Sequence, residues 1–154
     1  MLIFYGRELS VLSTRYIYIM IKTAEPQLSI FHNIRVLLAE DDEVSEQYLL
    51  ILLNRLGAEV EVVRRGDEVR AKLEEQTFQM LIIDLHLHPI NSLQLVKEIR
   101  TDIGKNLAIV GISTADLGGR AMGVGIDQVL RKPLESRVII ASLEQALLKQ
   151  IQSV

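Results

Sequence analysis

Short apolar runs that alternate with helical patterns constrain the fold of this chain more than any other feature. The apolar runs are predicted strands, at 35–39, 59–63, 80–83, 108–112 and 128–130. Runs this short and this apolar, separated by helical segments, are typical of parallel strands that are buried on both faces. Strand-helix-strand units connect by right-handed crossovers, which place helices on both faces of one sheet. The sequence therefore predicts a doubly wound, five-stranded parallel α/β fold.

Helical patterns lie between these strands and after the last one. Helices are expected over 44–56, 67–75, 92–100 and 134–151. The first helix carries apolar residues at the spacing of one helical face, which should pack on the sheet: Val44, Tyr48, Ile51, Leu52 and Leu56. Gly57 stands where a helix C-cap glycine is expected, and Asn91 or Ser92 can serve as an N-cap.

The last helix has more apolar surface than one buried face requires. Its apolar residues are Ile139, Ile140, Leu143, Leu147 and Leu148. We expect most of them in the core, with Ile140 or Leu147 exposed.

The composition excludes several classes of protein. With 154 residues, 49% hydrophobic and 24% charged, the chain suits one domain with an ordinary core. A net charge of −3 without any basic block argues against broad nucleic-acid binding. The absence of cysteine excludes disulfides and thiolate metal sites. No apolar run approaches the roughly 18 residues of a membrane span, and no signal peptide is evident, so we expect a cytoplasmic protein.

The chain divides near residue 34. Residues 1–33 form an N-terminal extension or linker in this interpretation, with possible short strands at 8–13 and 15–22. Residues 34–154 contain the alternating strands and helices and form the main domain.

Polar side chains follow four of the apolar runs. They are Glu40 and Asp41 after the first strand, Asp84 after the third, Ser113 after the fourth and Lys132 after the fifth. Ligands of an open parallel sheet bind outside the carboxyl ends of its strands, so these side chains should share one edge. Acids, a hydroxyl and a lysine are the composition of a site for a metal ion and a phosphoryl group. Mg²⁺ prefers oxygen ligands, and an aspartate can accept a phosphoryl group as an acyl phosphate.

Residues 34 to about 150 resemble the receiver domain of two-component response regulators, the CheY-like family. Four motifs in the family's order carry the resemblance: RVLLAEDDEV at 35–44, LIID at 81–84, ISTA at 112–115 and LRKP at 130–133. The resemblance implies a flavodoxin-like sheet with strand order 2-1-3-4-5.

The resemblance also implies a role for each site residue. The ligands of Mg²⁺ would be Glu40, Asp41, Asp84 and the backbone carbonyl of His86. Asp84 would accept the phosphoryl group, Ser113 would be the switch hydroxyl, and Lys132 would contact the phosphoryl oxygens. A cis peptide would join Lys132 to Pro133.

A phosphoryl-accepting switch is the function that this resemblance implies, rather than an enzyme. Its own chemistry would be Mg²⁺-dependent self-phosphorylation and slow autodephosphorylation. The donor would be a histidine kinase or a histidine phosphotransfer protein, and phosphorylation would change the affinity for partners. No DNA-binding or catalytic output domain follows the last helix, so we expect a stand-alone receiver or the receiver piece of a hybrid kinase. The sequence leaves the cognate kinase, the downstream partner and the oligomeric state open.

Several positions depart from the family pattern. Pro89 lies one residue later than usual, and Asn91-Ser92 replaces the usual Asp-Gly turn. The stretch between the fourth and fifth strands is shorter than usual and rich in glycine, so the fourth helix should be short. Val129 stands where the family has its switch aromatic. We expect an intact acceptor and an altered output surface.

Alternatives remain at the level of function and of single residues. The chain could be a pseudo-receiver that binds partners without phosphorylation, or a phosphohydrolase, although Leu85-His86 supplies no second acid after Asp84. Strand alternation favours Ser113 over Thr114 as the switch hydroxyl. Three further polar residues are interpreted without a site role: Asp42 as a helix-start residue, and His86 and His88, by their imidazoles, as loop histidines.

Overall fold

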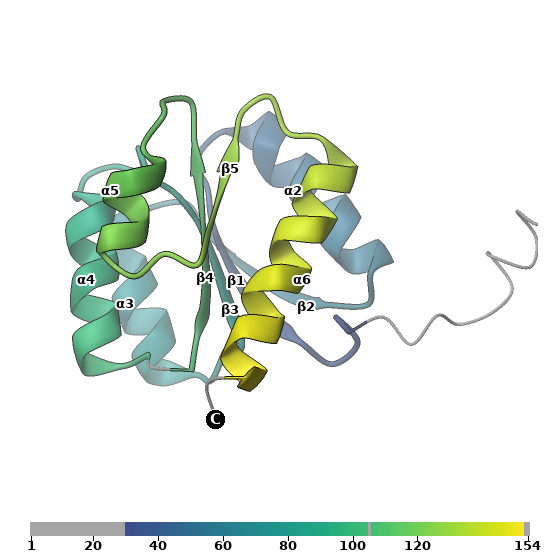
Figure 1. The fold of residues 1–154 in the computed structure, drawn as a ribbon, viewed down its shortest axis with the longest axis horizontal. Helices are drawn as coiled ribbons and strands as arrows, with labels where there is room; N and C mark the ends of the chain where they lie inside the picture. The colour runs from purple at the N-terminus through teal and green to yellow at the C-terminus, as the bar shows by residue number, and fades with distance from the viewer. Residues whose placement is uncertain (1–29, 105, 153–154) are drawn as a thin grey trace, which may run out of the picture.

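A parallel sheet forms the centre of the computed structural model, which describes residues 30–104 and 106–152 (Figure 1). Its strands are β1 (Arg35–Ala39), β2 (Glu59–Val63), β3 (Met80–Asp84), β4 (Ala108–Ser113) and β5 (Gln128–Arg131). The five strands lie in the order β2-β1-β3-β4-β5, and every neighbouring pair is parallel. The predicted fold class and strand order are confirmed.

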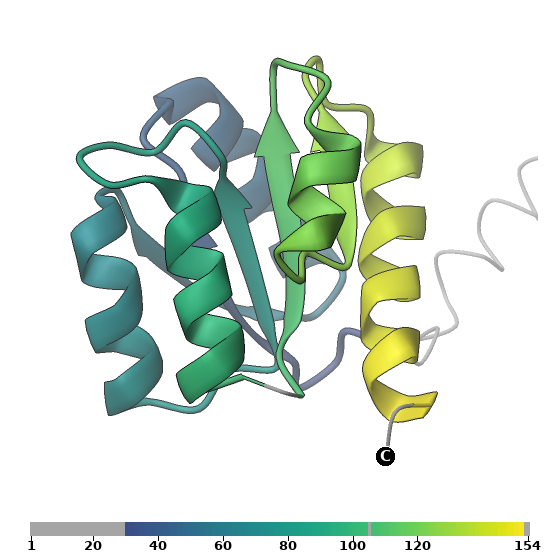
Figure 2. The same cartoon turned by 60° about the vertical axis from the view of Figure 1, so that its left-hand side comes forward.

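Helices cover both faces of this sheet. They are α2 (Glu43–Arg55), α3 (Gly66–Glu75), α4 (Ser92–Asp102), α5 (Gly118–Gly123) and α6 (Ser136–Gln152). Figure 2 shows α3, α4 and α5 in front of the sheet, with α2 behind it. The expected short fourth helix is α5, with 6 residues. Helix α6 begins at Ser136, two residues later than the sequence pattern predicted.

The central strand is buried on both faces, as its apolar run predicts. Alternate residues of a strand point to opposite sides. Leu81 and Ile83 pack in the core under α3 and α4, while Met80 and Ile82 pack in the core under α2 and α6. None of these four side chains is exposed to solvent. Burial on both sides fixes the register of β3, and with it the position of Asp84 at the strand's end.

The buried face of α2 matches the predicted one only in part, since Leu52 and Leu56 pack partly buried against the core. Leu49 and Leu53 are fully buried, whereas Val44, Tyr48 and Ile51 are 79%, 40% and 54% exposed. Apolar residues occupy 49–53 without interruption, so they surround the helix and their spacing does not select one face. Packing against β1 and α6, in the core on the α2 side of the sheet, determines which face of α2 is buried.

Helix α6 follows the prediction for most of its apolar residues. Ile139, Leu143 and Leu147 are buried on the sheet side. The prediction that Ile140 or Leu147 is exposed is wrong, because Leu147 is buried and Ile140 is partly buried. Leu148 is instead 46% exposed, because it lies about 100° around the helix from its buried neighbour.

Local signals at the helix ends are confirmed. Asp42 caps α2 by accepting a 2.8 Å hydrogen bond from Ser45 N, and Asn91 caps α4 by accepting a 3.1 Å bond from Gln94 N. Gly57 adopts a φ of 87°, a left-handed conformation that glycine reaches without strain.

The start of the main domain is only partly within the described residues. Phe31 is buried in the core with α2 and α6, ahead of the predicted boundary at residue 34. The possible strands at 8–13 and 15–22 lie outside the described residues. Among the helices that the structure describes, none has the length and apolar character needed to cross a membrane.

Candidate functional site

Three acids meet where β1 and β3 end. The pairing of β1 with β3 ends at Ala39 and Ile83. Glu40 and Asp84 directly follow these two residues. Asp41 follows directly and is exposed. One carboxylate oxygen from each acid lies within 4.8 Å of those of the other two. Three carboxylates at this spacing suit a hard divalent cation such as Mg²⁺.

Glu40 is the buried member of this acid cluster. Its side chain is fully buried, and burial raises its pKa from 4.5 to about 7. The amide of Asp42 donates a 3.1 Å hydrogen bond to Oε1 and lowers the pKa, while the charge of Asp84 raises it. Oε2 is buried and has no hydrogen-bond partner. A buried carboxylate oxygen without a hydrogen bond is costly to ionise, and a nearby cation offsets that cost.

Lys132, which directly follows β5, lies between Glu40 and Asp84. Its Nζ lies 3.0 Å from Asp84 Oδ2 and 3.1 Å from Glu40 Oε2. The contact to Glu40 Oε2 is an ion pair, and Nζ also donates a 3.4 Å hydrogen bond to Glu40 Oε1. Burial works to lower the pKa of Lys132, but the hydrogen bonds and charges of the two acids outweigh it and raise the pKa. The Lys132-Pro133 peptide is cis, as predicted.

Asp84 is held at both its side chain and its backbone. Its Oδ1 accepts a 2.7 Å hydrogen bond from His86 N. Its carbonyl accepts from Ser92 Oγ at 3.0 Å and from Leu87 N at 3.2 Å. The His86 imidazole is half-exposed, with Nδ1 3.7 Å from Asp84 Oδ1. The role predicted for the His86 carbonyl stays a prediction.

Ser113 lies at the same edge, at the end of β4. It is buried, and its Oγ accepts a 3.0 Å hydrogen bond from Ala115 N. Its carbonyl accepts from Lys132 N at 3.0 Å, which continues the pairing of β4 with β5. Thr114 is exposed. The choice of Ser113 over Thr114 as the switch hydroxyl stays a prediction.

Sequence reasoning missed two features of this edge. The sequence pattern predicts Ser92 only as a possible N-cap, although its hydroxyl contacts the Asp84 carbonyl. A hollow of about 310 Å³ lies beside Lys132 and is lined by Val44, Ser45, Tyr48, Lys132, Pro133 and Leu134. The replacement of the family's usual glycine by Ser92 was the available signal for the first feature. The hollow is lined in part by Val44 and Tyr48 of α2, which are exposed. The sequence pattern predicts both of them in the core.

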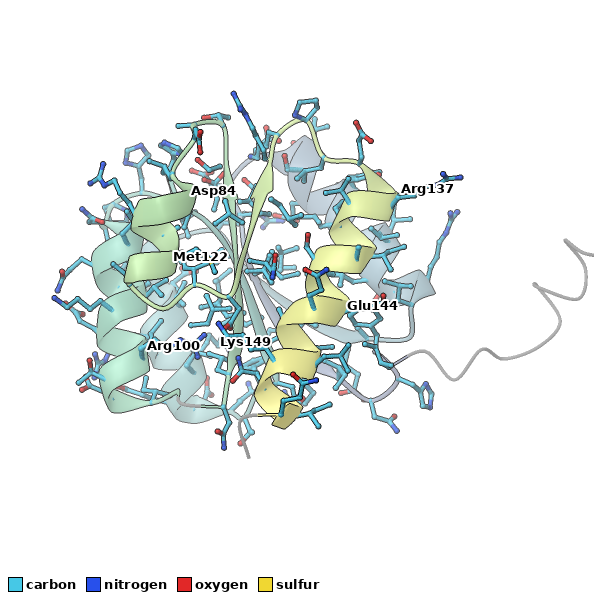
Figure 3. All side chains as sticks on the ribbon, viewed as in Figure 1. Asp84, Arg100, Met122, Arg137, Glu144 and Lys149 are labelled. Carbon is cyan, nitrogen blue, oxygen red and sulfur yellow. The ribbon has the colours of Figure 1, made fainter. Side chains whose placement is uncertain are left out.

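The opposite edge of the sheet carries no such acid cluster among the described residues. In Figure 3, Asp84 lies toward the upper edge, and Arg100 and Lys149 lie toward the lower one. A larger hollow of about 680 Å³ lies at the carboxyl ends of α3 and α4 and includes Arg100. Its lining does not include Glu40, Asp41 or Asp84.

Known proteins share the sequence pattern of this chain. A family model described as the response regulator receiver domain matches residues 36–144. Regulatory protein VanRB of Enterococcus faecalis is 29% identical over 116 residues, which cover 75% of this chain and 53% of that protein. Response regulator receiver protein CpdR of Brucella abortus is 27% identical over 117 residues, covering 74% of this chain and 97% of that protein. The chain spans about half the length of VanRB and of the transcriptional regulatory proteins CrdR and GltR.

Solved structures share its fold. The chemotaxis response regulator CheY4 of Vibrio cholerae has a TM-score of 0.69 at 24% identity, covering 75% of this chain and 99% of that one. The receiver domain of a sensor histidine kinase from Pseudomonas aeruginosa has a TM-score of 0.68 at 23% identity, covering 75% and 98%. That domain was crystallised with a magnesium ion coordinated in its active site cleft. By its sequence match and its fold, the chain belongs to the family of response regulator receiver domains.

Proposed function

We propose that this chain is a phosphoryl-accepting switch, with Asp84 as the acceptor and Mg²⁺ as the cofactor. The observation that carries the proposal is the ammonium of Lys132 set between Asp84 and the buried Glu40, whose Oε2 lacks a hydrogen-bond partner. A phosphorylation site needs a nucleophile, a fixed cation and room for a second cation. These residues offer all of them at one edge.

Mg²⁺ is the cation that best fits the acids. Glu40, Asp41 and Asp84 would hold it, with the His86 carbonyl as a further oxygen ligand. When bound, it supplies positive charge that offsets the charge on the phosphoryl oxygens. The magnesium ion in the cleft of the Pseudomonas aeruginosa receiver supports this choice.

The transfer itself requires positioning and charge neutralisation from this chain's residues. An oxygen of Asp84 forms a bond to phosphorus while the bond from phosphorus to the donor's histidine nitrogen breaks. The electron pair of that bond stays on the imidazole. Lys132 is already within ion-pair distance of Asp84 and can contact the incoming phosphoryl oxygens. Ser113 uses its oxygen to accept from Ala115 N, so its own proton can be donated to a phosphoryl oxygen.

The donor in this proposal is a phosphohistidine of a histidine kinase or a phosphotransfer protein. The chain itself is proposed to act on no other substrate. Its product, phosphorylated Asp84, would change the affinity of the surface for a partner.

Acetyl phosphate tests the proposal without a cognate kinase. The full chain is incubated with Mg²⁺ and acetyl phosphate, and intact mass is measured. We expect the added mass of one phosphoryl group, which Asp84→Asn abolishes. Asp102→Asn is the matched control, because Asp102 is an exposed carboxylate on α4 that pairs with Arg70. A chain that gains no phosphoryl group and binds no Mg²⁺ would instead be a pseudo-receiver, and steady phosphate release from many esters would indicate a hydrolase.

A further inference from the structure

The hydroxyl of Ser92 contacts the backbone of Asp84, the proposed acceptor. Ser92 is the first residue of α4 and is 1% exposed. Its Oγ lies 3.0 Å from the carbonyl oxygen of Asp84, to which it donates a hydrogen bond. A glycine here, the more usual residue in the family, could make no such bond.

The Asp84 carbonyl depends on the residues that follow it. Pairing of β3 with β1 ends at Ile83, one residue before Asp84. On the β4 side, the next ladder bond runs from Leu85 N to the Ile112 carbonyl at 2.8 Å. The Asp84 carbonyl accepts from Leu87 N at 3.2 Å and from Ser92 Oγ at 3.0 Å. Of these two donors, only Ser92 belongs to a helix.

Helix α4 gives Ser92 a rigid base. Asn91 caps the helix through its 3.1 Å bond from Gln94 N. Val96 and Ile99 are completely buried against the sheet. A hydroxyl on such a helix holds its partner more tightly than a donor on a loop can.

We propose that Ser92 is a positioning residue for phosphorylation and acts through the backbone of Asp84. The proposal rests on the proposed function of Asp84. By holding the carbonyl, the Ser92 hydroxyl limits rotation about the Cα–C bond of Asp84. That rotation would move the carboxylate relative to Lys132 Nζ, which lies 3.0 Å from Asp84 Oδ2, and relative to Glu40, which has a carboxylate oxygen within 4.8 Å of one of Asp84. In-line attack on phosphorus is sensitive to such small displacements.

The kinetic test removes only the hydroxyl. In Ser92→Ala, the rate constant for phosphorylation by acetyl phosphate at saturating Mg²⁺ should fall about three- to tenfold, the range expected for one lost hydrogen bond. Thr101→Val is the matched control, since it removes a hydroxyl of the same helix that bonds the Lys97 carbonyl. The control should keep the wild-type rate constant. Circular dichroism confirms that each variant is folded at the assay temperature.

A second measurement reads the hydrogen bond directly. The ¹³C carbonyl chemical shift of Asp84, measured on the full chain with Mg²⁺, should move in Ser92→Ala and stay fixed in Thr101→Val. A purely structural role would lower the melting temperature without slowing phosphorylation of the folded protein.

The outcomes separate the proposal from the function on which it rests. An unchanged Asp84 carbonyl shift would show that the bond does not form in solution. A changed shift with an unchanged rate constant would show that the bond does not position the acceptor. If the wild-type chain itself takes up no phosphoryl group, the proposed function fails together with the kinetic role of Ser92, whereas the carbonyl shift still reports the bond.

Discussion

At the scale of single residues, the three acids of the cluster differ in how deeply they are buried. Glu40 is buried, Asp41 is exposed, and Asp84 lies between them in burial. One ammonium, that of Lys132, faces the two more buried acids. Without a second cation, the full ionisation of Glu40 is opposed by its burial and by the charge of Asp84. A proton and a metal ion therefore compete for the carboxylate of Glu40.

The raised pKa of Glu40 predicts how Mg²⁺ binding depends on pH. A carboxyl whose pKa is raised by folding contributes stability that is present below its unfolded value of 4.5 and is lost as pH rises through about 7. Because Mg²⁺ needs the ionised form, its affinity should increase as pH rises through about 7, with release of a proton.

Calorimetry in buffers of different ionisation enthalpy measures both the affinity and the released proton. Glu40→Gln should bind Mg²⁺ more weakly and lose the pH dependence near 7. Equal pH dependence in the variant and the wild type would assign the proton to another group.

At the scale of elements, most of the fold and part of the site follow from the sequence. Strands β1, β3 and β4 were predictable because they are short, apolar and almost entirely buried. The edge strands β2 and β5 are only partly buried, and they were predictable from their alternation with helical patterns. The same pattern predicts that Asp84 and Lys132 lie at one edge, since parallel strands end together. The Ser92 bond was not predictable, because it depends on the path of the loop between β3 and α4.

The error in α2 has a physical cause that applies to other helices. Periodicity identifies a buried face only when the other faces are polar. In α2, Leu49 to Leu53 are all apolar, so several faces satisfy the pattern. Glu46 adds to the ambiguity, because it is buried and bonds Arg64 through both carboxylate oxygens at 2.6 and 2.7 Å. Tertiary contacts, rather than local spacing, choose the face.

A pair of substitutions in α2 checks which face is buried. Leu53→Ala should lower the free energy of unfolding by about 2–5 kcal/mol, because it leaves a cavity between α2 and the sheet. Ile51→Ala, two residues earlier and 54% exposed, should change it by no more than about 0.5 kcal/mol. Urea denaturation followed by circular dichroism measures both. Similar losses in the two variants would mean that α2 is rotated from the orientation described above.

At the scale of the whole molecule, the two edges of the sheet differ in how completely their charges are paired. At the edge opposite the acids, Arg100 donates to the carbonyls of Gly125, Gly104 and Leu107 and to Asp127 Oδ2, at 2.6 to 2.7 Å. Asp127 is buried and also accepts a 2.8 Å bond from Ile109 N. This network joins α4 to the starts of β4 and β5. At the acid edge, Glu40 Oε2 has no hydrogen bond.

This contrast predicts that stability and metal binding can be separated by mutation. Asp127→Ala removes the only carboxylate that Arg100 contacts in this network and leaves the buried Ile109 amide without its acceptor, which should cost about 3–5 kcal/mol of stability. Its Mg²⁺ affinity should match the wild type, because the acid cluster is at the other edge. Glu40→Gln should do the reverse, keeping stability in EDTA while losing Mg²⁺ affinity.

Urea denaturation with EDTA and with Mg²⁺ tests both variants in one design. Mg²⁺ at 100 times its dissociation constant should stabilise the wild type and Asp127→Ala by about 2.7 kcal/mol each. At that same concentration, it should stabilise Glu40→Gln far less, because the variant's dissociation constant is higher. Equal stabilisation of all three proteins would place the metal ion away from Glu40. A weakened metal affinity in Asp127→Ala would mean that the two edges are coupled through the sheet, since the strands joining them are continuous and buried on both sides.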